Sequence, residues 1–96
     1  MTGTTRSSEG LSERRRRLLF RAWRRGTREL DLITGRFADE VIGDLTEEEV
    51  AEFEGWCSAA DLDLYNWITG SKPVPAEYDT PLFRRLKNFN HGAAAV

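Results

Sequence analysis

Residues 18–30 have the sequence LLFRAWRRGTREL, and this stretch decides the fold because it closes one helix and opens the next. Gly26 stands where helices commonly end, and arginines fill the two positions before it, where the helix dipole favours cations. Thr27 can cap the second helix, and Glu29 places a negative charge in its first turn. We therefore expect a sharp corner from which Arg25 and Glu29 project together at an exposed apex.

Apolar residues recur at helical spacing on both sides of this corner. The helix before it follows an N-cap at Ser12, and its apolar face consists of Leu11, Leu18, Leu19, Ala22 and Trp23. The apolar face of the helix after it consists of Leu30, Ile33, Phe37 and Val41. Gly35 lies inside this second helix at a cost of about 1 kcal/mol relative to alanine, which indicates a close helix–helix contact. Gly43 ends the second helix.

Three further helices are indicated by their caps. Thr46 and Glu49 form the capping box of a third helix, with an apolar face of Val50, Phe53, Trp56 and Cys57. Asp61 or Asp63 caps a short fourth helix that ends at Gly70, with Leu64, Trp67 and Ile68 on one face. The connection over residues 71–78 contains two prolines and is expected to be ordered but not helical. Thr80 and Pro81 begin a fifth helix, with an apolar face of Leu82, Phe83, Leu86 and Phe89.

The length of 96 residues suits one domain. No segment alternates between apolar and polar residues as a strand would. The predicted fold is therefore all-α, a compact antiparallel five-helix bundle over residues 12–90. A disordered leader is expected at residues 1–11 and a flexible tail at residues 91–96.

Charge is distributed in blocks along the chain. Residues 1–36 contain ten arginines and four acidic residues, for a net charge of +6, whereas residues 37–79 contain twelve acidic residues and one lysine. Such blocks form a basic face and an acidic face if they separate in space.

The basic run over residues 14–28 is open to three interpretations. It can be a solvated helix face, the footprint of a regulatory nucleic-acid-binding protein, or a surface for an acidic protein partner. The acidic middle of the chain would repel phosphate, and no groove-reading helix rich in polar side chains follows a tight turn. These features favour a protein partner over a nucleic acid.

The composition gives little support for a catalytic site or a metal-binding site. Cys57 and His91 are the only residues of their types, so they cannot form a disulfide, a zinc site or a nucleophile–base pair without other ligands. The acidic cluster over residues 47–54 fits the first turns of a helix, where the dipole favours carboxylates. We expect neither catalytic nor metal-binding residues. No apolar run could span a bilayer, and the polar residues 1–10 do not fit a signal peptide, so the expected location is a bacterial cytoplasm.

The corner resembles the R-G-x-x-E motif of the succinate dehydrogenase assembly factor 2 family, called SdhE in bacteria, at Arg25, Gly26 and Glu29. The resemblance extends through the neighbouring segments RRLL (16–19), ELDL (29–32) and GRF (35–37). The segment DLYNWITG over residues 63–70 is similar to a second signature of that family. The likeness covers residues 13–90, although the arginine-rich approach to the motif departs from the family pattern.

This resemblance implies a monomeric five-helix protein that is not an enzyme. Its implied partner is the flavoprotein subunit of succinate dehydrogenase, and in some members that of fumarate reductase. The factor helps the subunit attach FAD covalently to one of the subunit's own histidines and binds no flavin stably by itself. The implied partner-binding residues are Arg25, Gly26 and Glu29, and we add the intervening Arg28. Helix-end chemistry alone also accounts for these residue types, and a general adaptor subunit stays an alternative.

Overall fold

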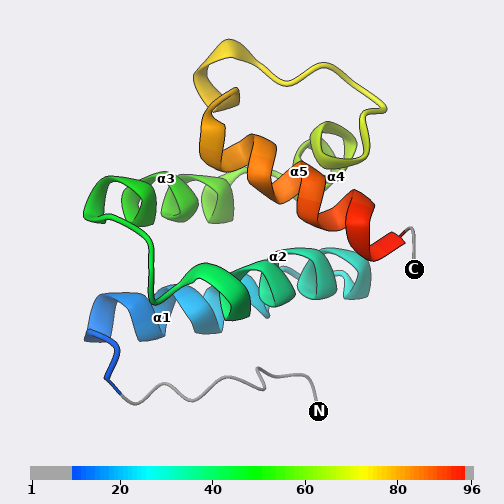
Figure 1. Ribbon diagram of the computed structural model, residues 1–96. Helices are drawn as coiled ribbons and strands as arrows, with labels where there is room; N and C mark the ends of the chain where they lie inside the picture. The colour runs from blue at the N-terminus through cyan, green and yellow to red at the C-terminus, as the bar shows by residue number, and fades with distance from the viewer. Residues whose placement is uncertain (1–9, 95–96) are drawn as a thin grey trace. The chain divides into compact units, whose positions relative to one another are not determined.

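The computed structural model describes the backbone of residues 10–94 and the side chains of residues 10–90. Within this range the structure is all-helical and has no strand, which confirms the predicted fold class (Figure 1). The elements are α1 (Glu13–Ala22), α2 (Arg28–Val41), α3 (Glu47–Ser58), α4 (Asp61–Thr69), the 3₁₀ helix η1 (Ala76–Tyr78) and α5 (Pro81–Ala94). None of the described helices combines the length and apolar character needed to cross a membrane.

Most of the predicted caps form as expected. Ser12 and Thr27 accept the backbone N–H of the residue three positions later, at 3.2 and 3.3 Å. Thr46 and Glu49 make both hydrogen bonds of the capping box, at 3.1 and 3.0 Å. The Thr80 hydroxyl accepts the Phe83 N–H at 3.2 Å. These helix starts were predictable because each depends only on neighbouring residues.

The end of α1 comes earlier than predicted. The helix stops at Ala22 with Trp23 as its C-cap, so residues 24 and 25 lie outside it and not in its last turn. The N–H groups of Trp23 and Arg24 bond three residues back, which tightens the final turn. The carbonyl of Ala22 accepts a hydrogen bond from the Thr34 hydroxyl of α2. A side chain of α2 therefore satisfies a carbonyl that would accept a backbone N–H of α1 if that helix were longer.

The second helix, α2, ends at Val41 with Ile42 as its C-cap, shortly before the predicted end at Gly43. The other differences concern residues after 59. Ala60 is the N-cap of α4 and makes no side-chain cap, so the prediction of Asp61 or Asp63 as N-cap is wrong. Both acids lie instead in the first turn of α4, where they complement the helix dipole. The connection over 71–78 contains η1, and α5 continues four residues past the expected boundary at residue 90. Most of the predicted leader, residues 1–9, and the last two residues lie outside the described part of the chain.

Two compact units divide the segment that was expected to be one domain, with the boundary between Ala59 and Ala60. The first unit contains α1, α2 and α3, and the second contains α4, η1 and α5. A single antiparallel bundle of all five helices stays a prediction.

The core of the first unit includes three aromatic rings from α2 and α3. Phe37 lies 6.1 Å from Phe53 and 6.3 Å from Trp56, measured between ring centroids, and Phe53 and Trp56 are 4.8 Å apart. Leu18 and Leu19 of α1 are buried as well. Most residues of the predicted apolar faces therefore form the core of this unit, whereas Leu11, Ile33 and Cys57 are half-buried.

The second unit has a smaller set of buried side chains. They come from α4 and α5 and are Leu64, Ile68, Leu82, Phe83 and Leu86. The half-buried Trp67 of α4 packs on Tyr78 of η1 with ring centroids 4.8 Å apart. This contact ties the proline-containing connection to α4.

Candidate partner-binding site

The corner between α1 and α2 is built on a close contact between the two helices. Trp23 and Gly35 are both buried, and a methyl group added at Gly35 would meet the indole ring, with the ring atom Cε3 at 2.7 Å. The indole N–H donates to the carboxylate of Asp39 at 3.2 Å. The close contact expected from Gly35 is therefore present, and its partner is a tryptophan ring.

Hydrogen bonds made by polar side chains of α2 stabilise the corner between α1 and α2. Thr34, which is 1% exposed, contacts the Ala22 carbonyl and also lies 2.8 Å from the Leu30 carbonyl. The Asp31 carboxylate accepts the backbone N–H of Arg25 at 2.5 Å. Gly26 has a φ of 109°, a conformation that L residues rarely adopt. These hydrogen bonds and the conformation of Gly26 together fix the path of the chain between α1 and α2.

Arg25 does not project from the apex, so this part of the prediction is wrong. Its guanidinium donates through Nη1 to the carbonyl of Cys57 and through Nη2 to the carbonyl of Ala59, the latter at 2.7 Å. The side chain is half-buried against the end of α3. The carbonyls at a helix C-terminus carry partial negative charge, which accounts for the attraction.

The exposed part of the corner is formed by the four residues from Gly26 to Glu29. Arg28 and Glu29 lie in the first turn of α2, after the N-cap at Thr27. Within the described part of the chain, neither side chain makes a hydrogen bond or an ion pair. Two opposite charges are therefore exposed at adjacent positions of the corner, but the basic residue is Arg28 and not the predicted Arg25.

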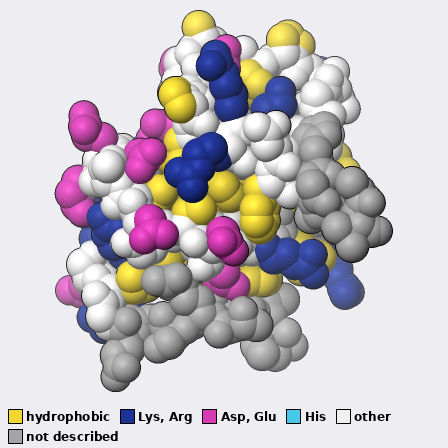
Figure 2. Space-filling model, in the orientation of Figure 1, with side chains coloured by type: hydrophobic (Ala, Val, Ile, Leu, Met, Phe, Trp, Pro, Cys, Tyr) yellow, Lys and Arg dark blue, Asp and Glu magenta, His cyan; other side chains and the backbone are white. Residues whose placement is uncertain are grey.

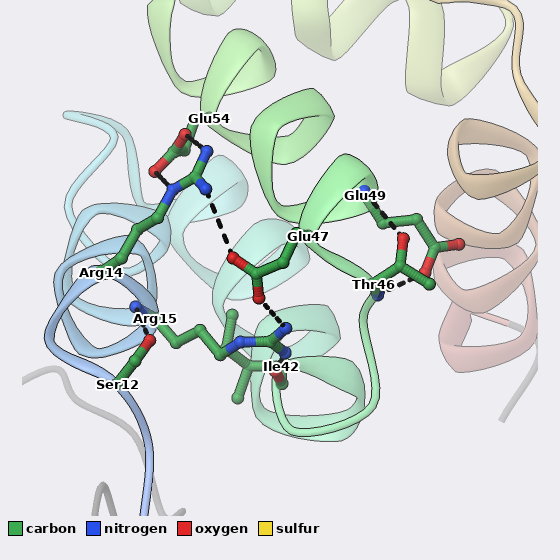
Figure 3. Close-up of polar contacts among 8 residues, drawn as sticks. All are labelled: Ser12, Arg14, Arg15, Ile42, Thr46, Glu47, Glu49 and Glu54. Atoms are coloured by element: carbon green, nitrogen blue, oxygen red, sulfur yellow. Dashed lines mark hydrogen bonds and ion pairs between the residues drawn. The ribbon is translucent and has the colours of Figure 1, made fainter.

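The basic and acidic blocks do not separate into two faces. Arg14 of α1 makes a two-pronged ion pair with Glu54 of α3, at 2.7 and 3.0 Å, and lies 3.5 Å from Glu47 (Figure 3). Arg15 donates to Glu47 at 2.7 Å and to the carbonyl of Ile42 at 2.8 Å. Figure 2 accordingly shows acidic and basic side chains close together over α1 and α3. The sequence blocks attract each other within the first unit, which leaves fewer arginines available for a nucleic acid.

The remaining outer surface of α1 is basic and contains one aromatic ring. Phe20 is 59% exposed, and the Arg24 guanidinium lies 4.4 Å from the centre of its ring. Cation–π contacts at exposed positions contribute about 0.5–1 kcal/mol, so this pair gives modest support to the end of α1.

The ion pairs between α1 and α3 make stability depend on pH. The hydrogen bond from Arg15 lowers the pKa of Glu47, and that from Arg14 lowers the pKa of Glu54, both from an ordinary value of 4.5. Carboxylates with lowered pKa values stabilise the fold above pH 4.5, and this contribution is lost as the pH falls through the folded-state pKa. We expect the melting temperature to fall below about pH 4.5, and to fall less steeply in Glu54→Gln.

Thermal melts followed by circular dichroism between about pH 7 and pH 3 measure this dependence. Glu48→Gln is the matched control, because Glu48 lies on the same helix and is exposed. Identical pH profiles for wild type and Glu54→Gln would show that the Arg14–Glu54 pair does not contribute to acid sensitivity.

Neither a reactive thiol nor a metal site emerges from the described side chains. Cys57, which was expected on the apolar face of α3, is half-buried, and burial raises the pKa of its thiol. A raised pKa keeps the thiol protonated and less nucleophilic. Among the described residues, no group of three or more His, Cys, Asp or Glu residues could hold a metal ion. The side chain of His91 lies outside the described set.

Several residues that form the corner were not recognised from the sequence. No role in forming the corner was predicted for Asp31, Thr34 or Asp39. Thr34 offered one signal, since a threonine on an apolar helix face needs a hydrogen-bond partner when buried. Nothing local indicated that this partner would be a carbonyl of α1.

Gly26→Arg is expected to affect both the fold and the surface. A side chain at the positive φ of Gly26 costs about 1–2 kcal/mol, and the new arginine would occupy the exposed apex. Chemical denaturation measures the first effect and affinity for the partner measures the second. Gly55→Arg is the control, since an added Cβ there has nothing within 4 Å. Wild-type stability and affinity in Gly26→Arg would contradict this account of the corner.

The fold and the corner define a small all-helical protein with two opposite charges exposed at the start of α2. The chain belongs to the family described as the flavinator of succinate dehydrogenase, whose model matches residues 16–90. It is 39% identical over 80 residues to the FAD assembly factor SdhE of Acetobacter pasteurianus, covering 83% of this chain and 73% of that protein.

Mitochondrial relatives are similar in the same region. Succinate dehydrogenase assembly factor 2-A of Drosophila mojavensis is 37% identical over 84 residues, and the protein of the same name from Drosophila yakuba is 36% identical over 93 residues. These matches cover 85% and 95% of this chain but only 54% and 57% of the fly proteins, so the chain spans little more than half of their length. The relatives are named as assembly factors and not as enzymes, in agreement with the prediction from composition.

Proposed function

We propose that this chain is an assembly factor that binds the flavoprotein subunit of succinate dehydrogenase and promotes the covalent attachment of FAD to it. The observation that carries the proposal is the exposed corner of Arg28 and Glu29, which lies inside the segment that matches the flavinator family. The names of the relatives indicate the process, which is the assembly of succinate dehydrogenase, and the corner offers a surface for binding the partner. The proposed location is the bacterial cytoplasm.

The proposed role of the chain is to position its partner. The groups that form the bond belong to the subunit's histidine and to the flavin, and the chain holds the subunit in the geometry in which they react. Holding reactants in a productive geometry lowers the barrier without a donated acid, base or nucleophile. In this proposal the chain binds no flavin stably by itself.

The proposed complex is stabilised by charge. Glu29 is an acceptor only and needs a basic group or an N–H donor on the partner, whereas Arg28 prefers a carboxylate. Both side chains project from the start of a helix whose position is fixed by Trp23 and Gly35. Little ordering of the backbone is then required on binding, which favours affinity. The flavoprotein subunit of fumarate reductase is a second proposed client.

A pull-down from native cytoplasm tests the proposed function. The tagged chain is expected to retain a yellow flavoprotein whose mass identifies it as the dehydrogenase subunit. Glu29→Ala serves as the paired bait, and it is expected to retain much less. Recovery of nucleic acid without a flavoprotein, with binding that weakens steeply as salt rises, would support the nucleic-acid alternative instead.

A further inference from the structure

The carboxyl end of α3 lacks the features with which helices usually end. Its C-cap is Ala59 in an extended conformation, and no basic residue lies in its last turn. Glycine caps and nearby cations are the common means of satisfying the last carbonyls. In α3 the Trp56 carbonyl accepts the N–H of Ala59 at 3.0 Å, whereas the carbonyls of the residues after Trp56 have no donor within the helix. A donor from elsewhere in the chain can therefore replace water at these carbonyls and stabilise the end of α3.

Arg25 supplies this donor from the corner between α1 and α2. Two separate nitrogens of its guanidinium bind the carbonyls of Cys57 and Ala59. The planar fork of an arginine can bind two acceptors at once, and its charge is favoured at a helix C-terminus. Arg25 thus provides both the hydrogen bonds and the positive charge that the sequence of α3 omits.

The backbone of Arg25 is held separately from its side chain. Its N–H donates to the carboxylate of Asp31 in the first turn of α2, at 2.5 Å. One residue is consequently fixed to α2 through its backbone and to α3 through its side chain. Gly26 follows directly and leads into the exposed residues Arg28 and Glu29.

We propose that Arg25 is a positioning residue, which fixes the corner to the end of α3 and so orients Arg28 and Glu29 without touching the partner. The inference rests on the proposed function, because the partner in question is the flavoprotein subunit. From the sequence motif alone, Arg25 and Glu29 are both expected to contact the partner. The geometry separates them, since Arg25 is bound within the chain and Glu29 is exposed.

The test compares four forms of the full chain: wild type, Arg25→Ala, Arg25→Lys and Arg28→Ala. The melting temperature of each free chain is measured first. The Kd for the purified apo-flavoprotein subunit is then measured at two salt concentrations, at a temperature where every variant is fully folded. Arg28→Ala is the matched control because it removes a neighbouring arginine that is exposed.

Arg25→Ala is expected to lower the melting temperature and to weaken binding by about tenfold, with the salt dependence of wild type. Arg25→Lys is expected to recover part of the affinity, because an ammonium group can bind one carbonyl but lacks the planar fork. Arg28→Ala is expected to keep the melting temperature and to show a smaller salt dependence, since it removes a charge that faces the partner.

Two results would overturn the positioning role alone. Wild-type affinity in folded Arg25→Ala would restrict the residue to stability. A wild-type melting temperature combined with reduced salt dependence in Arg25→Ala would make it a direct contact. If the wild-type chain does not bind the subunit at all, the proposed function fails and the positioning role fails with it.

Discussion

Gly35→Ala is expected to lower the free energy of unfolding by about 3 kcal/mol, at the upper end of the usual cost of overpacking a core. The added methyl group would enter the ring of Trp23, which is buried and held by its hydrogen bond to Asp39. The ring cannot move aside without losing burial and this bond. The loss would exceed the roughly 1 kcal/mol that alanine gains over glycine in a helix. Guanidinium denaturation followed by circular dichroism measures it.

Gly55→Ala is the matched control for this prediction. Gly55 also lies inside a helix, but an added Cβ there has nothing within 4 Å. We expect this variant to be more stable than wild type by about 0.5–1 kcal/mol, from backbone propensity alone. Equal stability of the two alanine variants would show that the contact between Trp23 and Gly35 does not set the spacing of α1 and α2.

Glu29→Ala is expected to leave the fold intact and to abolish stable binding of the flavoprotein subunit. The side chain is exposed, so its removal takes little away from the folded state. Truncating one member of a charge pair that becomes buried at an interface costs roughly 2–5 kcal/mol, or at least about 30-fold in Kd. Calorimetric titration of the apo-subunit measures the loss.

Glu40→Ala is the matched control, because it also removes one negative charge from α2. Glu40 is an exposed glutamate of the same helix, close to its opposite end. It is expected to bind the subunit with wild-type affinity. If both variants lose affinity to the same extent, the effect comes from net charge and the corner is not the specific site.

The local features of this fold could be predicted from sequence because they depend on near neighbours. Thr46 and Glu49 are three residues apart, and their capping box is present with both hydrogen bonds. The special positions of Gly26 and Gly35 were likewise visible. The identity of the ring that fills the space at Gly35 was not, since it depends on how α1 packs on α2.

The features that could not be predicted involve residues far apart in the chain. Arg25 was expected to project from the exposed apex, yet its guanidinium binds carbonyls 32 and 34 residues away. A backbone carbonyl has the same chemistry at every position, so the sequence carries no signal for such a partner. Arg14 and Glu54 form an ion pair although they are 40 residues apart in the chain. The distribution of charge along the sequence could not show whether these two side chains would come into contact.

The most direct test of the central claim is the rate of covalent flavin attachment. Apo-flavoprotein subunit is incubated with FAD and either the wild-type chain, Glu29→Ala or Glu40→Ala, and protein-bound flavin fluorescence is followed on denaturing gels. We expect faster attachment with the wild-type chain and with Glu40→Ala, whereas Glu29→Ala should leave attachment at the rate measured without any factor. Equal acceleration by Glu29→Ala and wild type would contradict the assignment of the corner as the working surface.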